Sequence, residues 1–232
     1  MNIFSPQDKM VSLVRHNYNL LPVLNRFGIR LGFKDKTVAE ICTEKNVDIN
    51  FFLAIVNTYH NEDYFPQQEL LSFSPLLIIR YLKETHQYYL NYVLPKLEKQ
   101  LDTLISGCNE QCEELNTIDA FYKRYKKELL NHLDEEEEKV FPYVEALFIQ
   151  SGFEKYNYKI KEFEKEHTNV EEQLNDLKNL LLKYLNPVYQ DNDCNEFLTT
   201  LFNFEKDITD HARIEDAILM VQVEKMEKET GR

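Results

Sequence analysis

The chain has 232 residues, enough for one or two domains, and 43% of them are apolar, as in an ordinary globular protein. Five glycines and seven prolines are too few for a β-sandwich or a disordered tail. The 40 acidic side chains outnumber the 27 basic ones, and the net charge of -13 repels phosphate, so we expect no nucleic-acid partner. No apolar run approaches the roughly 20 residues of a membrane span, and no secretory signal opens the chain, so we expect a cytoplasmic protein without a membrane partner.

The four cysteines are scattered along the chain, at Cys42, Cys108, Cys112 and Cys194. Their spacing matches neither a CxxC redox pair nor a zinc-ribbon set. A cytoplasmic environment keeps such thiols reduced. We therefore expect four ordinary thiols that pack as small apolar side chains.

Residues 1–73 are predicted to form a small helical N-terminal domain. Short helical patterns separated by turn signals cover residues 18–27, 37–45 and 49–58. Thr37 and Glu40 have the spacing of a capping box, and Asp48 is a second candidate helix cap. The polar stretch 61–73, which contains one proline, is expected to link this domain to the next one.

From residue 74 onward, apolar residues recur at steps of three and four, which predicts long helices. The apolar stripes run from Ile79 to Leu104, from Ile118 to Leu147, from Tyr156 to Leu181 and from Phe197 to Ile218. The first helix is expected to begin at Ser74 and Pro75, a capping serine followed by proline, and to end at Gly107. Four long helices with short connections predict an all-α, up-down-up-down four-helix bundle over residues 74–232.

Each predicted long helix has one histidine on its apolar stripe, near its middle; these are His86, His132, His167 and His211. Antiparallel packing brings such positions into one layer of the bundle. Glu136 and Glu215 each follow one of these histidines by four residues, a spacing that places both side chains on one helix face. A buried carboxylate needs a paired charge or a metal ion, so the pattern predicts a metal site. For Glu136 the alternative is a solvated face, because it lies in the acidic run 134–138.

Four imidazoles and two carboxylates are more ligands than one tetrahedral zinc ion takes. Two ions that are bridged by both glutamates, and are each capped by two histidines, use all six side chains. Mixed nitrogen and oxygen ligation suits iron, and manganese or zinc fits less well. We therefore predict a non-haem centre of two iron ions. The sequence leaves open whether His86 and His132 share one ion or bind different ions.

The pattern H…HxxxE…H…HxxxE resembles the hemerythrin-like domain, and in particular the di-iron proteins that repair iron–sulfur clusters, the repair-of-iron-centres family. Oxygen-carrying hemerythrins have a fifth histidine ligand and end in an aspartate at a longer spacing, unlike this chain. A ferritin-like centre needs two ExxH pairs, and only Glu164 and His167 fit that order. The resemblance implies a hemerythrin-like bundle whose di-iron centre has oxo and carboxylate bridges.

The N-terminal residues extend the resemblance to nearly the whole chain. Members of the repair family have a motif similar to FGIDFCCGG followed by T-x-x-E-x-C; this chain has FGIRLGFKD at 27–35 and the second motif at 37–42. Gly32 and Phe33 stand where the family has its adjacent cysteine pair. If those cysteines hand over iron or exchange thiols in the family, that step is missing here or is done differently.

The resemblance implies a stress-response protein that helps to restore iron–sulfur clusters after nitrosative or oxidative damage. It would release iron, or react with NO or O₂, and iron–sulfur apo-proteins would be its protein partners. Glu128 and Glu166 lie where the family is acidic, and they are either relays for iron or protons or ordinary surface charges. The alternative function is an O₂ or NO sensor, or a regulatory module, that uses the di-iron site without repair activity.

Overall fold

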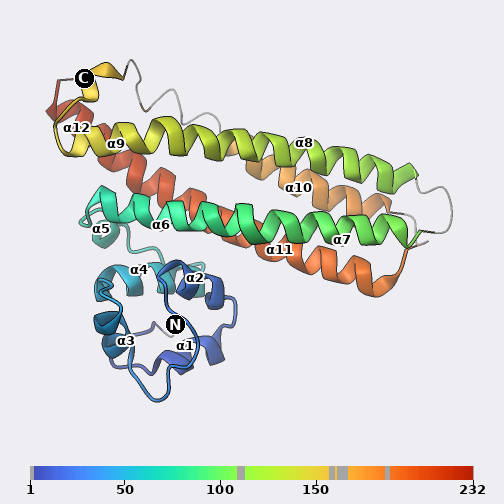
Figure 1. The fold of residues 1–232 in the computed structure, drawn as a ribbon, viewed down its shortest axis with the longest axis horizontal. Coiled ribbons are helices and arrows are strands. Elements are labelled where there is room, and N and C mark those ends of the chain that lie inside the picture. Colours follow the sequence, from blue (N-terminus) through green and yellow to red (C-terminus); the bar gives the residue numbers. More distant parts are fainter. Residues whose placement is uncertain (1–2, 109–112, 157–159, 161–166, 186–188, 232) are drawn as a thin grey trace. The chain divides into compact units, whose positions relative to one another are not determined.

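The computed structural model describes residues 3–108, 113–156, 160, 167–185 and 189–231 (Figure 1). Within these residues the regular elements are helices, accompanied by an isolated bridge between Lys9 and Thr37, so the predicted all-α fold is confirmed. The chain divides into two compact units. The first comprises Met1–Thr85 and Arg213–Gln222, and the second comprises His86–Ala212 and Val223–Arg232. The predicted domain boundary at residue 73 stays a prediction.

The first unit contains short helices and parts of two longer ones: α1 (Met10–His16), α2 (Leu20–Arg26), α3 (Val38–Glu44), α4 (Ile49–His60), α5 (Gln67–Leu70), most of α6 (Pro75–Tyr88) and the π-helical segment η5 (Glu215–Met220). The caps of α3 and α4 are as predicted: the Glu40 amide donates to Thr37 Oγ1 at 3.2 Å, and the Phe51 amide donates to Asp48 Oδ1 at 2.8 Å. The seven-residue helix α1 was not predicted, because Lys9 at its N-cap gives no capping signal and no glycine follows its last residue.

The stretch 61–73, predicted as a linker, is held by hydrogen bonds inside this unit. Gln67 Nε2 donates to the Ala217 carbonyl at 3.2 Å, and Gln222 Nε2 donates to the Phe73 carbonyl at 2.8 Å. One of these bonds satisfies a carbonyl of the stretch, that of Phe73, and the other satisfies a carbonyl far along the sequence, that of Ala217. The role of the stretch as a linker stays a prediction.

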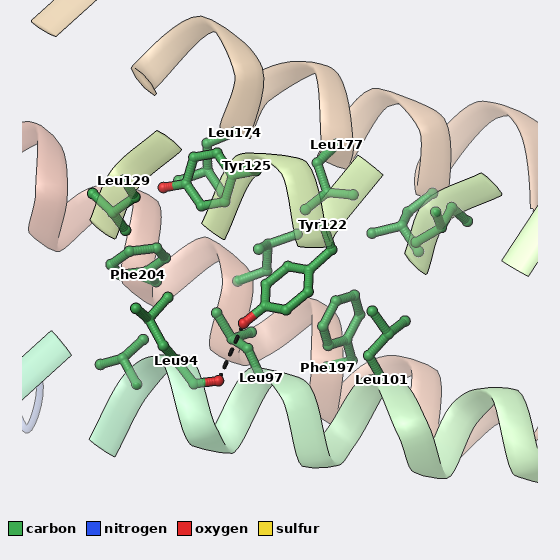
Figure 2. Packing of buried hydrophobic residues seen from close by; sticks show 14 of the residues in the cluster. Leu94, Leu97, Leu101, Tyr122, Tyr125, Leu129, Leu174, Leu177, Phe197 and Phe204 are labelled. Atoms are coloured by element: carbon green, nitrogen blue, oxygen red, sulfur yellow. Dashed lines mark hydrogen bonds between the residues drawn. The ribbon is translucent and has the colours of Figure 1, made fainter. Parts of the chain in front are cut away.

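The second unit contains most of the long helices: η1 (Tyr89–Val93), α7 (Leu94–Ser106), α8 (Glu113–Glu135), η2 (Glu136–Val140), α9 (Phe141–Phe148), η3 (Phe153–Lys155), α10 (His167–Tyr184), α11 (Asp191–Ile214) and most of α12 (Val221–Glu229). Figure 1 shows α7, α8, α10 and α11 side by side. Their buried faces share one apolar cluster, part of which Figure 2 shows, and the predicted bundle of helices is confirmed in this arrangement.

Two helix boundaries differ from the predictions. Tyr156 has an extended backbone after η3, so the third helix does not begin there, and residues 157–159 and 161–166 lie outside the described part of the chain. The fourth long helix begins at Asp191 and continues through η5 into α12 to Glu229, beyond the predicted stripe that ends at Ile218. Buried Val223 and Glu227 anchor this extension to the rest of the fold.

The cysteines also depart in part from the prediction. Cys42 and Cys194 are free and buried, as expected of small apolar side chains. Cys108 is disulfide-bonded, so the prediction of a reduced thiol is wrong there. That prediction was based on an assumed compartment, which does not determine whether two thiols meet; Cys112 lies outside the described residues. No helix formed by the described residues is long and apolar enough to cross a membrane.

Tyr122 ties α8 to α7 within the core of the second unit. Its buried hydroxyl donates a hydrogen bond to the Leu94 carbonyl at 3.1 Å (Figure 2). Burial raises the pKa of Tyr122, so the phenol stays protonated and remains a donor throughout the neutral range.

We predict that Tyr122→Phe lowers the free energy of unfolding by about 1 kcal/mol, because the Leu94 carbonyl loses a buried donor. Urea unfolding of the variant and the native chain measures this difference. Tyr184→Phe, at an exposed position, is the control and should leave the stability unchanged. An unchanged midpoint for Tyr122→Phe would contradict a stabilising role for the bond.

Candidate metal centre

His86 lies in the last turn of α6 and is completely buried. Its Nδ1 lies 2.9 Å from Oε1 of Glu137, a residue of η2. Its ring stacks on the Phe141 ring, with the centroids 5.5 Å apart and the planes 18° from parallel. Because a carboxylate holds the Nδ1 side, Nε2 is the nitrogen that remains for a ligand, which is the usual arrangement of metal-binding histidines.

Glu136 begins η2, and its side chain is completely buried. Its Oε2 lies 3.1 Å from Nε2 of His86, and its Oε1 lies 2.9 Å from Nε2 of His132. His132 precedes Glu136 by four residues, so the two side chains share one helix face, as the HxxxE spacing predicted. One buried carboxylate therefore faces imidazoles from two different helices, and the solvated-face alternative for Glu136 is wrong.

His211 comes from α11 and is 3% exposed. Its Nε2 lies 3.4 Å from Nε2 of His86, and the two rings meet edge to face with centroids 5.1 Å apart. His86, Glu136 and His211 each offer a ligand atom, and these atoms lie within 4.8 Å of one another. With His132 beside Glu136, the structure brings together four of the six predicted ligands.

The other two predicted ligands are placed less fully. Glu215 begins η5, one turn after His211 along a continuous helix, and is completely buried. His167 begins α10, but its side chain lies outside the described part of the structure. The roles of Glu215 and His167 as ligands therefore stay predictions.

The two candidate relay residues also differ in what the structure describes. Glu128 is half-buried and accepts a hydrogen bond from Gln173 Nε2 of α10, so it has a structural role in joining α8 to α10. Glu166 lies outside the described residues. A relay function for either residue stays a prediction.

Three π-helical segments lie at or beside the predicted ligands. Segment η1 begins three residues after His86, η2 begins at Glu136 and η5 begins at Glu215. In η1 and η2, the closing amide bonds to a carbonyl five residues earlier. Pro95 and Pro142 come directly after these closing amides. Proline has no amide proton to donate within a helix, so a locally wider turn accommodates it, and such segments often occur at functional sites.

The donor set fits a metal ion of the predicted kind. A buried carboxylate among buried imidazoles calls for a positive charge, which a metal ion supplies without further desolvation of a side-chain cation. The donors are nitrogen and oxygen with no thiolate, a combination that suits iron or manganese and also accepts zinc. Phe141 covers one face of His86, so the centre has an apolar wall that limits access of water.

A sequence profile described as the hemerythrin HHE cation binding domain matches residues 77–223. The chain belongs to the hemerythrin family. The matched range includes all six predicted ligands, and membership of the hemerythrin family implies a metal centre, typically of iron. No curated protein matches this hemerythrin-family chain.

Glu137 is the residue of this hemerythrin-type centre that sequence reasoning missed. Its side chain is 31% exposed, and it lies in the acidic run 134–138, where the sequence offers five similar carboxylates. The only signal for Glu137 in the sequence was its position next to the predicted ligand Glu136. Choosing Glu137 over its neighbours requires knowing that it faces His86 on another helix.

We predict that Glu137→Gln weakens metal binding about 10- to 100-fold, because the amide holds Nδ1 of His86 less firmly than the carboxylate does. Competition with a chromophoric chelator measures this affinity. Glu138→Gln removes the same charge from the exposed neighbour and should leave the affinity near that of the native chain. Equal losses in both variants would assign the effect to the overall acidity of η2.

Proposed function

We propose that this chain is a cytoplasmic di-iron protein that helps to restore iron–sulfur clusters after nitrosative or oxidative damage. The observation that supports it most directly is the buried Glu136 carboxylate, with one oxygen beside His86 and the other beside His132. Imidazoles at both of its oxygens support a bridging role for this carboxylate between two ions, and the resemblance to the repair-of-iron-centres proteins connects a centre of this type with repair.

The contacts also suggest how the histidines divide between the ions. His86 lies beside Oε2 of Glu136, and its Nε2 is 3.4 Å from Nε2 of His211, so we assign both histidines to one ion. His132 lies on the Oε1 side, so we assign it to the second ion. In this proposal, His167 completes the second ion's pair of histidines and Glu215 is the second bridge.

Iron bound in this way supplies coordination positions for O₂ or NO, and it is also the cargo that a repair protein delivers. The residues around the predicted ligands hold these ligands in place. Glu137 orients His86, and Phe141 limits the access of water to that side of the centre. Neither residue binds the ion in this proposal, so both can influence reactivity without changing the number of ligands.

The N-terminal unit does not offer a thiol route for the iron. Gly32 has φ +102°, a conformation that a cysteine would adopt only under strain, and Phe33 is buried. Burial raises the pKa of Cys42 to about 12, so this thiol is protonated at neutral pH and is a poor ligand or nucleophile. Repair by this chain would therefore deliver iron directly from the bundle.

The proposal is tested by loading the metal-free chain anaerobically with ferrous iron and mixing it with an apo iron–sulfur acceptor. We expect about two iron ions per chain, because the six predicted ligands suffice for two ions. We also expect transfer of this iron to the acceptor, where a cluster is assembled. His132→Ala and Glu215→Ala should lose bound iron and transfer together. Elemental analysis and the acceptor's visible spectrum measure the two quantities.

His16→Ala and His60→Ala are the controls for this experiment, because neither histidine lies on a bundle stripe. Both variants should keep the iron content and the transfer of the native chain. Loss of iron in His16→Ala would show that the ligand assignment is wrong. Full iron content with no transfer to any acceptor would exclude repair by iron delivery and leave the metal centre intact.

Sensing is a second candidate, and the connection of α11 to the N-terminal unit favours it. Two residues after His211, the helix passes Arg213, which donates to the Glu62 carbonyl at 3.2 Å and lies 4.2 Å from the centre of the Phe65 ring. A shift of His211 along its helix axis would therefore reach the stretch 61–73 through covalently continuous backbone.

We predict for a sensor that amide hydrogen exchange in residues 61–73 differs between the oxidised and reduced iron-loaded protein. Arg213→Gln should remove much of this difference, because it loses the cationic contacts that hold Glu62 and Phe65. Arg124→Gln, an exposed arginine of α8, is the control. Identical exchange in both redox states would contradict sensing through α11.

A further inference from the structure

A series of aromatic rings leads from the ligand His211 to the surface of the second unit. The Tyr89 ring lies 5.8 Å from the His211 ring, the Tyr88 ring lies 6.1 Å from Tyr89, and the Tyr92 ring lies 5.5 Å from Tyr88. These centroid distances are within the range of about 4.5–7 Å for aromatic rings in contact. Tyr89 is completely buried, Tyr88 is half-buried and Tyr92 is 54% exposed, so the series runs from the core to solvent.

The first ring of the series has a proton acceptor. The Tyr89 hydroxyl donates to Oδ1 of Asp207 at 3.2 Å, and Asp207 is half-buried and thus in reach of solvent. A phenol gives up an electron far more readily when its proton leaves at the same time. Asp207 is therefore placed to receive the proton when Tyr89 is oxidised and to return it when Tyr89 is reduced.

The far end of the series is placed for contact with a dissolved molecule. Tyr92 stacks on Tyr88 with only 22° between the ring planes, and the Lys96 ammonium lies 5.8 Å from the Tyr92 ring centre. An exposed phenol next to a positive charge suits an anionic one-electron reductant. Ordinary packing of residues four apart explains the Tyr92–Tyr88 pair alone, but not its continuation to a buried tyrosine with a carboxylate acceptor.

We propose that Tyr89, Tyr88 and Tyr92 form a relay that carries oxidising equivalents from the metal centre to the surface, where an anionic reductant such as ascorbate quenches them. The proposal rests on the proposed function, because it requires a redox-active metal at His86 and His211. Its role is to protect the ligands when the iron-loaded protein meets a peroxide.

The electrons and protons balance along the relay. Tyr89 gives one electron to the oxidised centre and its proton to Asp207. Tyr88 then gives one electron to Tyr89, which takes its proton back, and Tyr88 releases its own proton to water. Tyr92 reduces Tyr88 in the same way, and ascorbate finally supplies one electron and one proton to Tyr92. The net change is one-electron oxidation of ascorbate and one-electron reduction of the centre.

The first test treats the iron-loaded protein with hydrogen peroxide and a nitroso spin trap, without ascorbate, and maps the trapped residues by peptide mass spectrometry. We expect trapping at Tyr92 in the native chain and its loss in Tyr89→Phe. Tyr184→Phe removes an exposed tyrosine from another helix of the same unit and should leave trapping at Tyr92 unchanged. Ascorbate should suppress the trapping in the native chain.

Equal trapping at Tyr92 in the native chain and in Tyr89→Phe would overturn the relay, because peroxide would then oxidise the surface directly. Oxidation of His86 and His211, read from the same peptides, is the second readout. It should increase in Tyr89→Phe, since the equivalents then remain at the ligands. Iron content measured before the peroxide step establishes separately whether the proposed metal centre forms.

A second test does not depend on iron. Metal-free protein is oxidised from solution by a photogenerated ruthenium(III) complex and frozen, and the tyrosyl radicals are examined by electron–nuclear double resonance in heavy water. If the radical migrates from Tyr92 to Tyr89, the spectrum should contain a component from the Tyr89 radical. This component is recognised by the exchangeable hydrogen bond between Tyr89 and Asp207. Tyr92→Phe should lose this component and Tyr184→Phe should keep it. Its absence in the native chain, or its persistence in Tyr92→Phe, would refute the relay even if the protein fails to bind iron.

Discussion

A buried carboxylate facing two imidazoles is the constraint on which the centre depends. Removing the Glu136 charge from water costs several kcal/mol unless a positive charge or a metal ion compensates it. The compensating groups come from different helices, so the helices must pack in a fixed register before the site exists. The apolar cluster of the second unit, with Leu129, Leu174 and Phe204 among its members, supplies that register (Figure 2).

Much of the fold was predictable because its signals are local. A capping serine followed by proline marks the start of α6. Helix α7 ends at Gly107 as expected, although Gly107 has a right-handed backbone, with φ -76°, that any residue can adopt. His86, Glu136 and His211 were also predictable, since a polar residue on an apolar stripe is conspicuous within a single helix. Helix α1 has neither a capping side chain at Lys9 nor a terminal glycine, so the sequence gives no local signal for it.

The features that the sequence does not reveal depend on pairs of residues far apart in the chain. Glu137 differs from Asp134, Glu135 and Glu138 in lying beside Nδ1 of His86, a residue 51 positions away in the chain. The π-helical segments have a visible signal in Pro95 and Pro142, since a proline inside a long helix must be accommodated, yet η5 is followed by no proline. Periodicity finds the face of a helix, whereas the partner on the opposite helix is set by packing.

The aromatic character of the core bears on both its stability and its chemistry. The chain has 14 tyrosines and 15 phenylalanines but no tryptophan, and Tyr89, Phe141 and Phe204 lie in or around the ligand layer. Rings that exclude water from a metal centre are also the nearest groups that an oxidant at the centre can attack. Tyr89 differs from the two phenylalanines in having a hydroxyl that donates to Asp207, which is the proton acceptor in the proposed relay. Placing a tyrosine rather than a phenylalanine beside His211 therefore gives an oxidant a harmless route away from the imidazoles, while the packing contribution of the ring is kept.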